Sequence, residues 1–488
     1  MGTDVALARR VASPRSLGRL VRQVSDRTVW AGVASGLLLA LAEGVRGSAP
    51  LVFVALVPLV AALEVAPLRS ALAAGFVCGL VFFLLSCAWV PFAGAGRLEL
   101  VLVYLLFTPL LALPMAGFAL AVAWLRRFGH TTFLVGGSAL WVAIELGRRS
   151  SELGSQFHLG YVLADHPALI QLASLGGVHL VSLWIVAVNA ALVGALSSPK
   201  RCIPALLGIV IAPCAFGFAA LHGAPKPSLN NRRIAVAGVQ PEVRPLERYV
   251  PEYFDQHLRE LLGLSERTLR DRPDLIVWPE SAFERLSPAS GAPFLGAIAH
   301  QLGTPLLSGV WRLAKGEPVS LRNSSLLATP DGSVLVAADK MNPIWMFERA
   351  PQSAGGERLA RAGFWPGRFA GGAPPEVLLL PRASTPIRLG VLVCVDATYS
   401  EIARDLRRRG AELLVTIANE ADSGRRMSLV QARIARIRAV ESRAPLVRVA
   451  NTGPSEWVDS HGGVVASIET GASRAQTASL DLGEDPPL

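Results

Sequence analysis

The stretch Gly390–Asp396, Gly-Val-Leu-Val-Cys-Val-Asp, gives the strongest indication of how the polar half of this chain folds. Its apolar run predicts a buried β-strand that ends on Cys394, and the residues from Ser400 onward have helical spacing. The chain has five cysteines, and the others all lie in long apolar segments: Cys78, Cys87, Cys202 and Cys214. Cys394 therefore has no disulfide partner in the polar half. It is a candidate nucleophile, because the thiolate is the reactive form of cysteine.

Two further apolar runs end on groups that can activate a thiol. Residues 275–280 end on the carboxylate of Glu280, and residues 334–340 end on the ammonium of Lys340. Taken singly, a cysteine after a strand is more often a small core residue, and a strand-end Lys or Glu is more often a solvated charge or a helix cap. Three strands that each end on one member of a Glu, Lys, Cys set favour catalysis instead.

Length and composition place part of the chain in a membrane. A chain of 488 residues is too long for one ordinary domain, and its 51% hydrophobic residues and mean hydropathy of +0.42 exceed the usual values for soluble proteins. The excess lies before Pro225, where apolar runs approach the length needed to cross about 30 Å of hydrocarbon. The sequence predicts about seven spans, at residues 29–44, 50–67, 70–93, 99–125, 132–147, 168–197 and 203–221.

The distribution of Lys and Arg predicts the orientation of these spans, because basic residues in short loops favour the cytoplasmic side. Arginines are frequent before residue 28, and basic residues follow the second, fourth and sixth predicted spans. We therefore expect a basic cytoplasmic tail at residues 1–28, a transmembrane helical domain at 29–222, and a domain on the outer face at 232–488. The net charge of +10 is then a topology signal, and nucleic-acid binding is not expected.

The predicted spans contain few charged residues, which argues against a transport pathway. Asn189 and Ser182 are polar residues of the sixth span, and we expect them to form hydrogen bonds with neighbouring helices. His158, His166 and His179 lack the spacing of metal ligands in the sequence, so we interpret them as interfacial or helix-contact residues. No metal or cofactor is expected.

The domain from Arg232 onward has short apolar runs separated by amphipathic stretches, which predicts an α/β sandwich with strands inside and helices outside. The helical stretches are residues 252–271 and 426–443, and in the second of these Arg433, Arg436 and Arg443 are expected on a polar face. The predicted strands are residues 233–240, 274–279, 305–311, 324–329, 334–338, 387–394, 412–418 and 445–450.

These residues carry a resemblance that covers nearly the whole chain. Pro279–Glu280 after a strand, Lys340 followed by Glu348, and the stretch around Cys394 resemble the nitrilase, or carbon–nitrogen hydrolase, superfamily. A domain of this kind preceded by membrane spans resembles the apolipoprotein N-acyltransferase family. The resemblance implies an α-β-β-α sandwich and a Glu, Lys, Cys triad. Its catalytic residues would be Glu280, Lys340 and Cys394, supported by Glu348, Val395, Asp396 and Asn419.

The resemblance also implies an activity and a location. The protein would transfer an acyl chain from a membrane phospholipid to the N-terminal amine of a diacylated apolipoprotein, through a thioester on Cys394. It would be a multi-pass protein of the bacterial inner membrane, with its catalytic domain in the periplasm, and a monomer. Two alternatives remain open at this point: a membrane-tethered nitrilase-type amidase or hydrolase, and a non-catalytic scaffold that has kept the fold.

Several segments depart from the pattern of that family. Val395 and Asp396 stand where the family usually has an aromatic residue and an acid, and the loops 341–348 and 419–424 also differ. The family normally closes with an eighth span, whereas this sequence ends at Leu488 without one. Because the loops shape the mouth of the pocket, the sequence leaves open the acyl chain, the phospholipid class and the set of lipoproteins.

Overall fold

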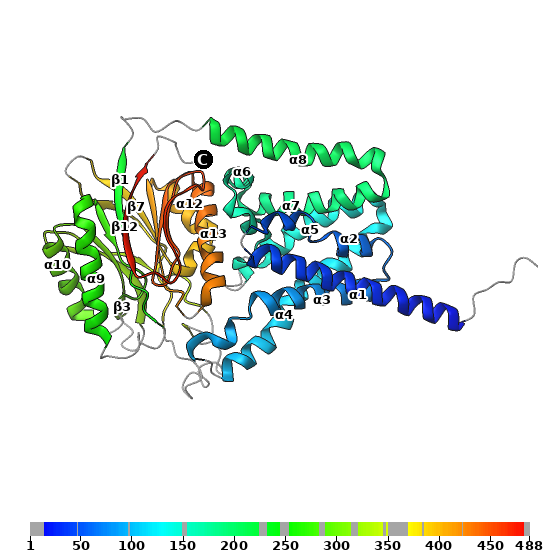
Figure 1. Ribbon diagram of the computed structural model, residues 1–488, viewed down its shortest axis with the longest axis horizontal. Coiled ribbons are helices and arrows are strands. Elements are labelled where there is room, and N and C mark those ends of the chain that lie inside the picture. The colour runs from blue at the N-terminus through cyan, green and yellow to red at the C-terminus, as the bar shows by residue number, and fades with distance from the viewer. Residues whose placement is uncertain are drawn as a thin grey trace, which may run out of the picture. The chain divides into compact units, whose positions relative to one another are not determined.

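The computed structural model describes most of the chain (Figure 1). The described residues are 14–45, 47–95, 98–148, 154–223, 232–244, 253–282, 288–313, 321–344, 348–349, 369–382, 385–421 and 423–482. The chain forms two compact units. The helical unit comprises Met1–Ala88, Tyr104–Ile144 and Leu183–Val210, and the sandwich unit comprises Trp89–Val103, Glu145–Ser182 and Ile211–Leu488.

The first half of the chain is helical, as predicted, and several of its helices are shorter or longer than the predicted spans. The α-helices are α1 (Pro14–Gly44), α2 (Val57–Leu63), α3 (Leu68–Ser86), α4 (Leu98–Leu125), α5 (His130–Arg148), α6 (Pro167–Ile170), α7 (Ala173–Ser197) and α8 (Pro199–His222). Short 3₁₀ helices connect them: η1 (Ala49–Phe53), η2 (Val90–Ala95), η3 (Arg126–Phe128), η4 (Gly154–Gln156) and η5 (Leu159–Asp165).

Among the described residues, 4 helical segments are long and apolar enough to cross a membrane: Leu68–Phe92, Leu100–Phe128, Ala173–Ser197 and Pro199–His222. The predicted span at 50–67 is instead divided between η1 and α2, and each of these helices has a proline in its first turn. Proline is tolerated there but interrupts a continuous helix. The helix α1 begins at Pro14, so residues 14–28 of the predicted tail are helical, whereas residues 1–13 lie outside the described residues.

The polar residues of α7 contact neighbouring segments, as the sequence predicts. The Asn189 side chain accepts a hydrogen bond from Leu56 N (2.9 Å) and donates one to Val52 O (2.9 Å). These backbone groups lie where η1 gives way to α2, and helix ends leave such groups without partners of their own. Ser182 Oγ accepts a hydrogen bond from Gly160 N (2.9 Å). The prediction that Asn189 and Ser182 bond to other segments is confirmed.

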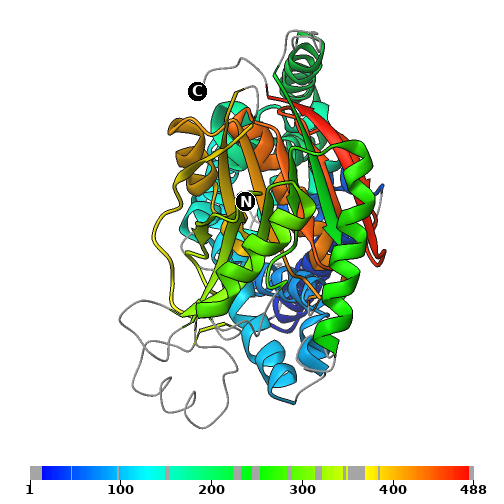
Figure 2. The same ribbon diagram turned by 90° about the vertical axis from the view of Figure 1, so that its left-hand side faces the viewer.

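The sandwich unit contains two six-stranded sheets (Figures 1 and 2). The first has the order β12-β1-β2-β3-β4-β5 and the second β11-β10-β9-β8-β7-β6. The strands of the first sheet are β1 (Arg233–Gln240), β2 (Leu275–Val277), β3 (Leu306–Leu313), β4 (Leu321–Ala328), β5 (Val334–Asp339) and β12 (Arg474–Asp481). Those of the second are β6 (Val377–Leu380), β7 (Ile387–Val393), β8 (Leu413–Ala418), β9 (Leu446–Ala450), β10 (Ser455–Val458) and β11 (Val464–Ile468).

Side chains alternate between the two faces of each strand, so each sheet packs against the other sheet on one face and against helices on the other. Leu275 and Val277 of β2 join the apolar core that also contains Val391 and Val393 of β7, so this core lies between the sheets. Ile276 points the other way, into a core that it shares with α9 (Phe254–Thr268) and α10 (Pro288–Leu302). Helices α12 (Ser400–Arg408) and α13 (Gly424–Ser442) cover the outer face of the second sheet. The predicted α-β-β-α sandwich is therefore observed.

Parallel pairing brings the ends of the central strands to common edges. In the first sheet β2 pairs in parallel with β1 and β3, and in the second β8 pairs in parallel with β7 and β9. Residues that follow β7 and β8 therefore emerge at the same edge of their sheet. This edge carries Cys394, in the 3₁₀ helix η9 (Cys394–Thr398), and Asn419.

The arginines of helix α13 lie on a polar face that other parts of the sandwich unit cover. Most of the helix is buried, including Arg433 and Arg438. Arg433 Nε donates a hydrogen bond to Asp165 Oδ2 (3.0 Å), and Arg436 contacts both Asp165 and Glu456. The predicted polar face is therefore buried: Asp165, between α5 and α7, and Glu456 of β10 supply acids for its cations.

Candidate active site

The three predicted catalytic residues lie just beyond the ends of three strands. Glu280 lies three residues beyond β2, and Lys340 directly follows β5 of the same sheet. Cys394 directly follows β7 of the facing sheet. All three side chains are buried, since Glu280 is 3% exposed, Lys340 1% and Cys394 8%. Buried charged groups require partners, because an isolated charge is strongly disfavoured in the protein interior.

The ammonium of Lys340 is held between two carboxylates. Its Nζ lies 2.9 Å from Glu280 Oε1 and 2.8 Å from Glu348 Oε1. Its backbone is fixed as well, since Lys340 N donates to Asn323 O (2.7 Å) and Lys340 O accepts from Gly372 N (2.8 Å). The structure therefore brings the predicted supporting residue Glu348 onto Lys340, eight residues away in the chain. Lys340 has a single well-defined position from which its remaining N–H can be directed.

These partners set the charge of Lys340. Burial alone lowers the pKa of the Lys340 ammonium, but Cys394, when it is a thiolate, and the carboxylates of Glu280 and Glu348 raise it, and the net pKa lies well above its ordinary value. Lys340 is therefore an ammonium at any pH at which the protein works. A permanently charged donor in a buried site interacts strongly with an anion that forms nearby.

Cys394 is a protonated thiol at rest. Burial raises the pKa of Cys394, and the carboxylates of Glu280, Glu420 and Glu348 raise it further, whereas Lys340 lowers it. The net pKa lies well above the ordinary value, because burial and three acids outweigh one ammonium. A reaction through the thiolate would need a base to accept the thiol proton, and Glu280 is the candidate.

The backbone at the site is strained at two places. Cys394 and Ser281, the residue after Glu280, both have φ of 54°. Residues with side chains adopt this left-handed region at a cost of about 1 kcal/mol or more, and such residues are frequent at active sites. The strand-to-helix turn at Cys394 projects the thiol away from the strand direction. Trp311 Nε1 supports the second turn through a hydrogen bond to Ser281 Oγ (2.9 Å).

The other predicted supporting residues lie around the same centre. Val395 is buried in η9, where its backbone directly follows the nucleophile. Asp396 accepts hydrogen bonds from Met341 N (2.8 Å), Asn342 N (3.0 Å) and Asn342 Nδ2 (3.0 Å). Asp396 therefore fixes the two residues that follow Lys340. Burial raises the pKa of Asp396 to about 6, although these hydrogen bonds oppose the shift.

Asn419 contacts the backbone of the site. The carboxylate of its neighbour Glu420 raises the pKa of the Cys394 thiol. Asn419 Nδ2 lies 3.4 Å from Glu280 O. Glu420 Oε1 accepts a hydrogen bond from Arg448, and burial raises the pKa of Glu420 even though Arg448 opposes the shift. Its Oε2 has no hydrogen-bond partner among the described residues. Glu420 could have been found from the sequence, because it follows a buried strand in the same way as Glu280.

Asn323 is a second residue that the prediction of the site did not include. Its Nδ2 donates to Glu280 Oε1 (2.6 Å) and lies 3.3 Å from Glu348 Oε1. Asn323 thus contacts both carboxylates that hold Lys340. The available signal was an amide directly before the predicted strand 324–329, next to Ser324.

Gly309 of β3 allows the backbone at Glu280 to approach closely. A Cβ atom at position 309 would lie 2.6 Å from Glu280 Cα and 2.6 Å from Ser281 N. Such contacts are shorter than van der Waals distances permit, so any side chain here would displace Glu280. Glycine is required at this position by packing.

Comparison with known proteins agrees with this arrangement. Residues 233–484 match the family described as Carbon-nitrogen hydrolase. The sandwich and the charged groups around the thiol place the second half of the chain in that class of proteins. Residues 35–191 match the family described as Apolipoprotein N-acyltransferase N-terminal domain.

Relatives extend the similarity over the whole chain. An apolipoprotein N-acyltransferase from Geobacter metallireducens is 30% identical over 485 residues, which cover 94% of this chain and 91% of that protein. Another, from Azotobacter vinelandii, is 30% identical over 467 residues, which cover 91% of this chain and 88% of that protein. This chain belongs to the apolipoprotein N-acyltransferase family, and the resemblance seen in the sequence is confirmed.

The chain is also similar to solved structures at lower identity. A carbon-nitrogen hydrolase from Helicobacter pylori G27 is 20% identical, with a TM-score of 0.37 over 51% of this chain and 90% of that chain.

Proposed function

We propose that this protein transfers an acyl chain from a membrane phospholipid to the N-terminal amine of a diacylated apolipoprotein. The observation that carries the proposal is the buried Lys340, which is held between Glu280 and Glu348 beside the thiol of Cys394. This arrangement offers a nucleophile, a base and a fixed cation, which are the groups that acyl transfer requires. Membership of the family supports the acceptor, because its named members are apolipoprotein N-acyltransferases.

The first half-reaction would load the enzyme. Cys394 Sγ attacks the ester carbonyl of the phospholipid while Glu280 accepts the thiol proton. The oxyanion that forms faces the Lys340 ammonium and the backbone N–H of Val395, and one such donor is typically worth about 3 kcal/mol. The carbon–oxygen bond of the ester then breaks, and Glu280 returns the proton to the leaving lysophospholipid. A thioester on Cys394 remains.

The second half-reaction would transfer the acyl group from Cys394 to the apolipoprotein. The neutral α-amine of the lipid-modified N-terminal cysteine attacks the thioester carbonyl, and Glu280 accepts a proton from the nitrogen. The oxyanion again faces Lys340. When the carbon–sulfur bond breaks, Sγ takes up the proton and the amide is released. Since burial raises the pKa of Cys394, the thiol is regenerated in its resting, protonated form.

The same proposal extends to location. The apolar helical segments before residue 223, of which 4 are long enough to cross a membrane, would anchor the protein in the bacterial inner membrane, with the catalytic half on the periplasmic side. Both substrates carry lipid chains and are confined to the membrane, so a tethered catalytic domain meets them without releasing either into water. We propose that a monomer performs the reaction without a cofactor.

Capture of the acyl-enzyme tests this function. The full chain in detergent is incubated with an alkyne-tagged phospholipid and then with a synthetic diacylated lipopeptide whose lipid-modified N-terminal cysteine has a free α-amine. We expect label on the wild-type chain, removable by neutral hydroxylamine, and its transfer to the lipopeptide as a mass increase of one acyl chain. The variant Cys394→Ala should take no label, whereas the control Cys202→Ala, which changes a cysteine of α8, should behave as wild type.

Other outcomes would contradict the proposal in distinct ways. Release of free fatty acid with no modified lipopeptide would identify a hydrolase, in which water accepts the acyl group. Failure of the folded wild-type chain to take label from any phospholipid would indicate a scaffold without activity.

A further inference from the structure

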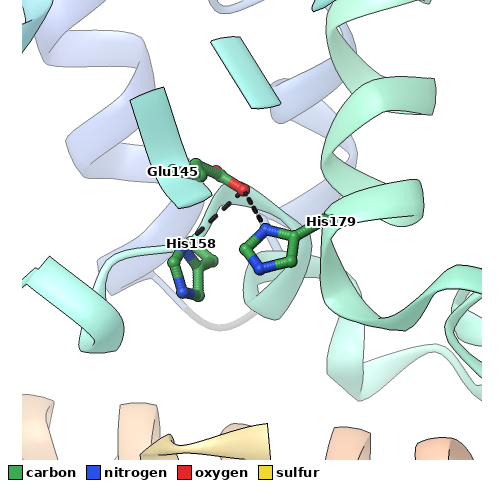
Figure 3. Close-up of side chains that lie close together, drawn as sticks. All are labelled: Glu145, His158 and His179. Atoms are coloured by element: carbon green, nitrogen blue, oxygen red, sulfur yellow. Dashed lines mark hydrogen bonds and ion pairs between the residues drawn. The ribbon is translucent and has the colours of Figure 1, made fainter. Parts of the chain in front are cut away.

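Three side chains outside the catalytic centre converge from separate segments of the sandwich unit. They are Glu145 at the end of α5, His158 between η4 and η5, and His179 in α7 (Figure 3). One ligand atom of each residue lies within 4.8 Å of the others. In Figure 3 both imidazole rings turn a nitrogen toward the Glu145 carboxylate. The histidines are 21 positions apart in the chain, so their sequence spacing gave no sign of this cluster.

The distances within the cluster are those of ligands around a shared ion. Glu145 Oε2 lies 3.3 Å from His179 Nδ1 and 3.7 Å from His158 Nδ1. A hydrogen bond between a charged imidazole and a carboxylate is usually about 2.7–2.9 Å long. Ligands at about 2.0–2.2 Å from a tetrahedral metal ion are instead about 3.3–3.6 Å from each other. Both contacts are thus long for hydrogen bonds and close to the separation of metal ligands.

His158 provides a second, independent observation. The side chain is buried, with 4% of the residue exposed, and its Nδ1 has no hydrogen-bond partner among the described residues. A buried polar atom without a partner costs about 1–3 kcal/mol and calls for a ligand. This nitrogen points at the same carboxylate oxygen as His179 Nδ1. A metal ion between the three atoms would satisfy all of them.

We propose that Glu145, His158 and His179 bind a divalent transition-metal ion, with Zn²⁺ as the expected occupant. Two imidazoles and one carboxylate are a common set of zinc ligands, and a tetrahedral ion then keeps one position for water. His179 is the more exposed of the two histidines, with 16% of its side chain accessible. The proposal departs from the sequence-based expectation that the chain binds no metal.

The surrounding contacts suit a metal site and suggest what the ion would do. Glu145 Oε1 accepts a hydrogen bond from Leu159 N (2.8 Å), and such outer contacts orient metal-binding carboxylates. Leu159 begins η5, which also carries Tyr161 and Asp165, the partners of Arg438 and Arg433 in α13. The ion would therefore join α5, η5 and α7, and would fix the segment that packs against α13. Its role would be structural and separate from acyl transfer.

Metal content of the intact protein tests the site without reference to activity. The full chain is purified in detergent without a metal-affinity tag, stripped with EDTA, and titrated with Zn²⁺ or Co²⁺. We expect elemental mass spectrometry to find one tightly bound Zn²⁺ ion per chain. Bound Co²⁺ should show the intense visible absorption of a tetrahedral ion.

Single substitutions test which side chains bind the ion. Glu145→Gln, His158→Gln and His179→Phe should each weaken binding more than about 100-fold, since loss of even an outer-shell partner costs about 10- to 100-fold. His166→Gln is the matched control, because His166 lies near the same segment but outside the cluster. It should bind Zn²⁺ as the wild type does.

Two results would overturn the proposal. The first is a wild-type chain that takes up no Zn²⁺ and gives no tetrahedral Co²⁺ spectrum, which would leave only a cluster of two histidines on a carboxylate. The second is Zn²⁺ binding that survives in all three cluster variants. The wild-type spectrum decides the question even if a variant fails to fold.

Discussion

At Asp396, a single carboxylate connects the nucleophile to the segment after Lys340. It lies two residues after Cys394 and receives three hydrogen bonds from Met341 and Asn342. Because burial raises its pKa to about 6, the folded protein binds a proton here more readily than the unfolded chain, whose Asp has a pKa near 4. The contribution of this group to stability is therefore largest below about pH 4 and is lost as the pH rises through about 6.

Activity should depend on pH in the opposite direction. Protonation of Asp396 converts one acceptor oxygen into a donor that faces N–H groups, and the segment after Lys340 loses its anchor. We expect the rate of acyl transfer to fall as the pH drops through about 6. Asp396→Asn should be slow at all pH values and should lack this transition. A pH profile of the variant that keeps the same inflexion would assign it to another group.

Glu348 gives a second prediction at the residue scale. Glu348→Gln removes one of the two carboxylates on Lys340 Nζ, so the ammonium is less firmly placed. We expect kcat to fall about 10- to 100-fold with little change in KM, since a misplacement of about 1 Å can cost a factor of about 100. Steady-state kinetics with a labelled lipopeptide measures both constants.

Asp339→Asn is the matched control for Glu348→Gln. Asp339 is the residue before Lys340, but its carboxylate bonds to Arg312 Nε (3.0 Å) and Ser324 Oγ (2.6 Å). This substitution should lower stability without a comparable loss of kcat. Equal losses of kcat in both variants would show that Glu348 and Asp339 both act by holding the end of β5. Glu348 would then have no specific effect on the Lys340 ammonium.

At the scale of elements, Gly309 of β3 lies so close to the backbone after β2 that β3 sets the position of Glu280. The variant Gly309→Ala places a methyl group against the backbone of residues 280 and 281. Overpacking of this kind costs about 1–3 kcal/mol, and here it also moves the base. We expect a loss of acyl transfer that exceeds the loss of stability. Thermal unfolding and the transfer assay on the same preparation separate the two effects.

Gly263→Ala is the control at this scale. No atom lies within 4 Å of a Cβ placed at Gly263 of α9. Alanine in a helix interior is favoured over glycine by about 1 kcal/mol, so this variant should be as active as wild type and slightly more stable. If Gly309→Ala also retains full activity, the close approach of β3 to Glu280 has no bearing on catalysis.

The elements that the sequence predicted are those with strong local patterns. The predicted strand 233–240 coincides with β1, and the strands that carry the site were placed within a few residues. The strands β6, β10, β11 and β12 were not predicted, and most of them lie at the edges of the sheets. Edge strands such as β11 and β12 expose many residues, so their alternation is weak. The helix α10 was missed because it contains Pro293 and many small residues.

At the scale of the whole molecule, the catalytic half depends on residues that precede it. Within the sandwich unit, Arg438 donates to Tyr161 Oη (2.6 Å), Glu441 Oε1 accepts from Val178 N (2.7 Å), and Arg433 pairs with Asp165. A fragment from Arg232 to Leu488 would lack the second member of each pair. Each buried group left without its partner costs about 1–3 kcal/mol.

We therefore expect α13 to lose protection when this fragment is made. Hydrogen exchange of the fragment should be much faster in α13 than in the full chain, and nearly unchanged in α9. The helix α9 is the internal control, because it packs on β1 and β12 and its Ser265 accepts a hydrogen bond from Trp278 (2.8 Å). Equal protection of α13 in both proteins would show that residues 145–182 are not needed for its packing.

The sequence by itself indicated the layered fold of the second half and made Glu280, Lys340 and Cys394 candidate site residues, while its resemblance to a known family indicated the class of the protein and added Glu348. It could do so because apolar periodicity and polar residues at strand ends are local properties of a chain. The tertiary structure alone decided that Asn323 bonds to the carboxylates on Lys340, that α13 is covered on its charged side, and that Glu145 meets two histidines. Those facts depend on which surfaces meet after folding, and no spacing along the chain encodes them.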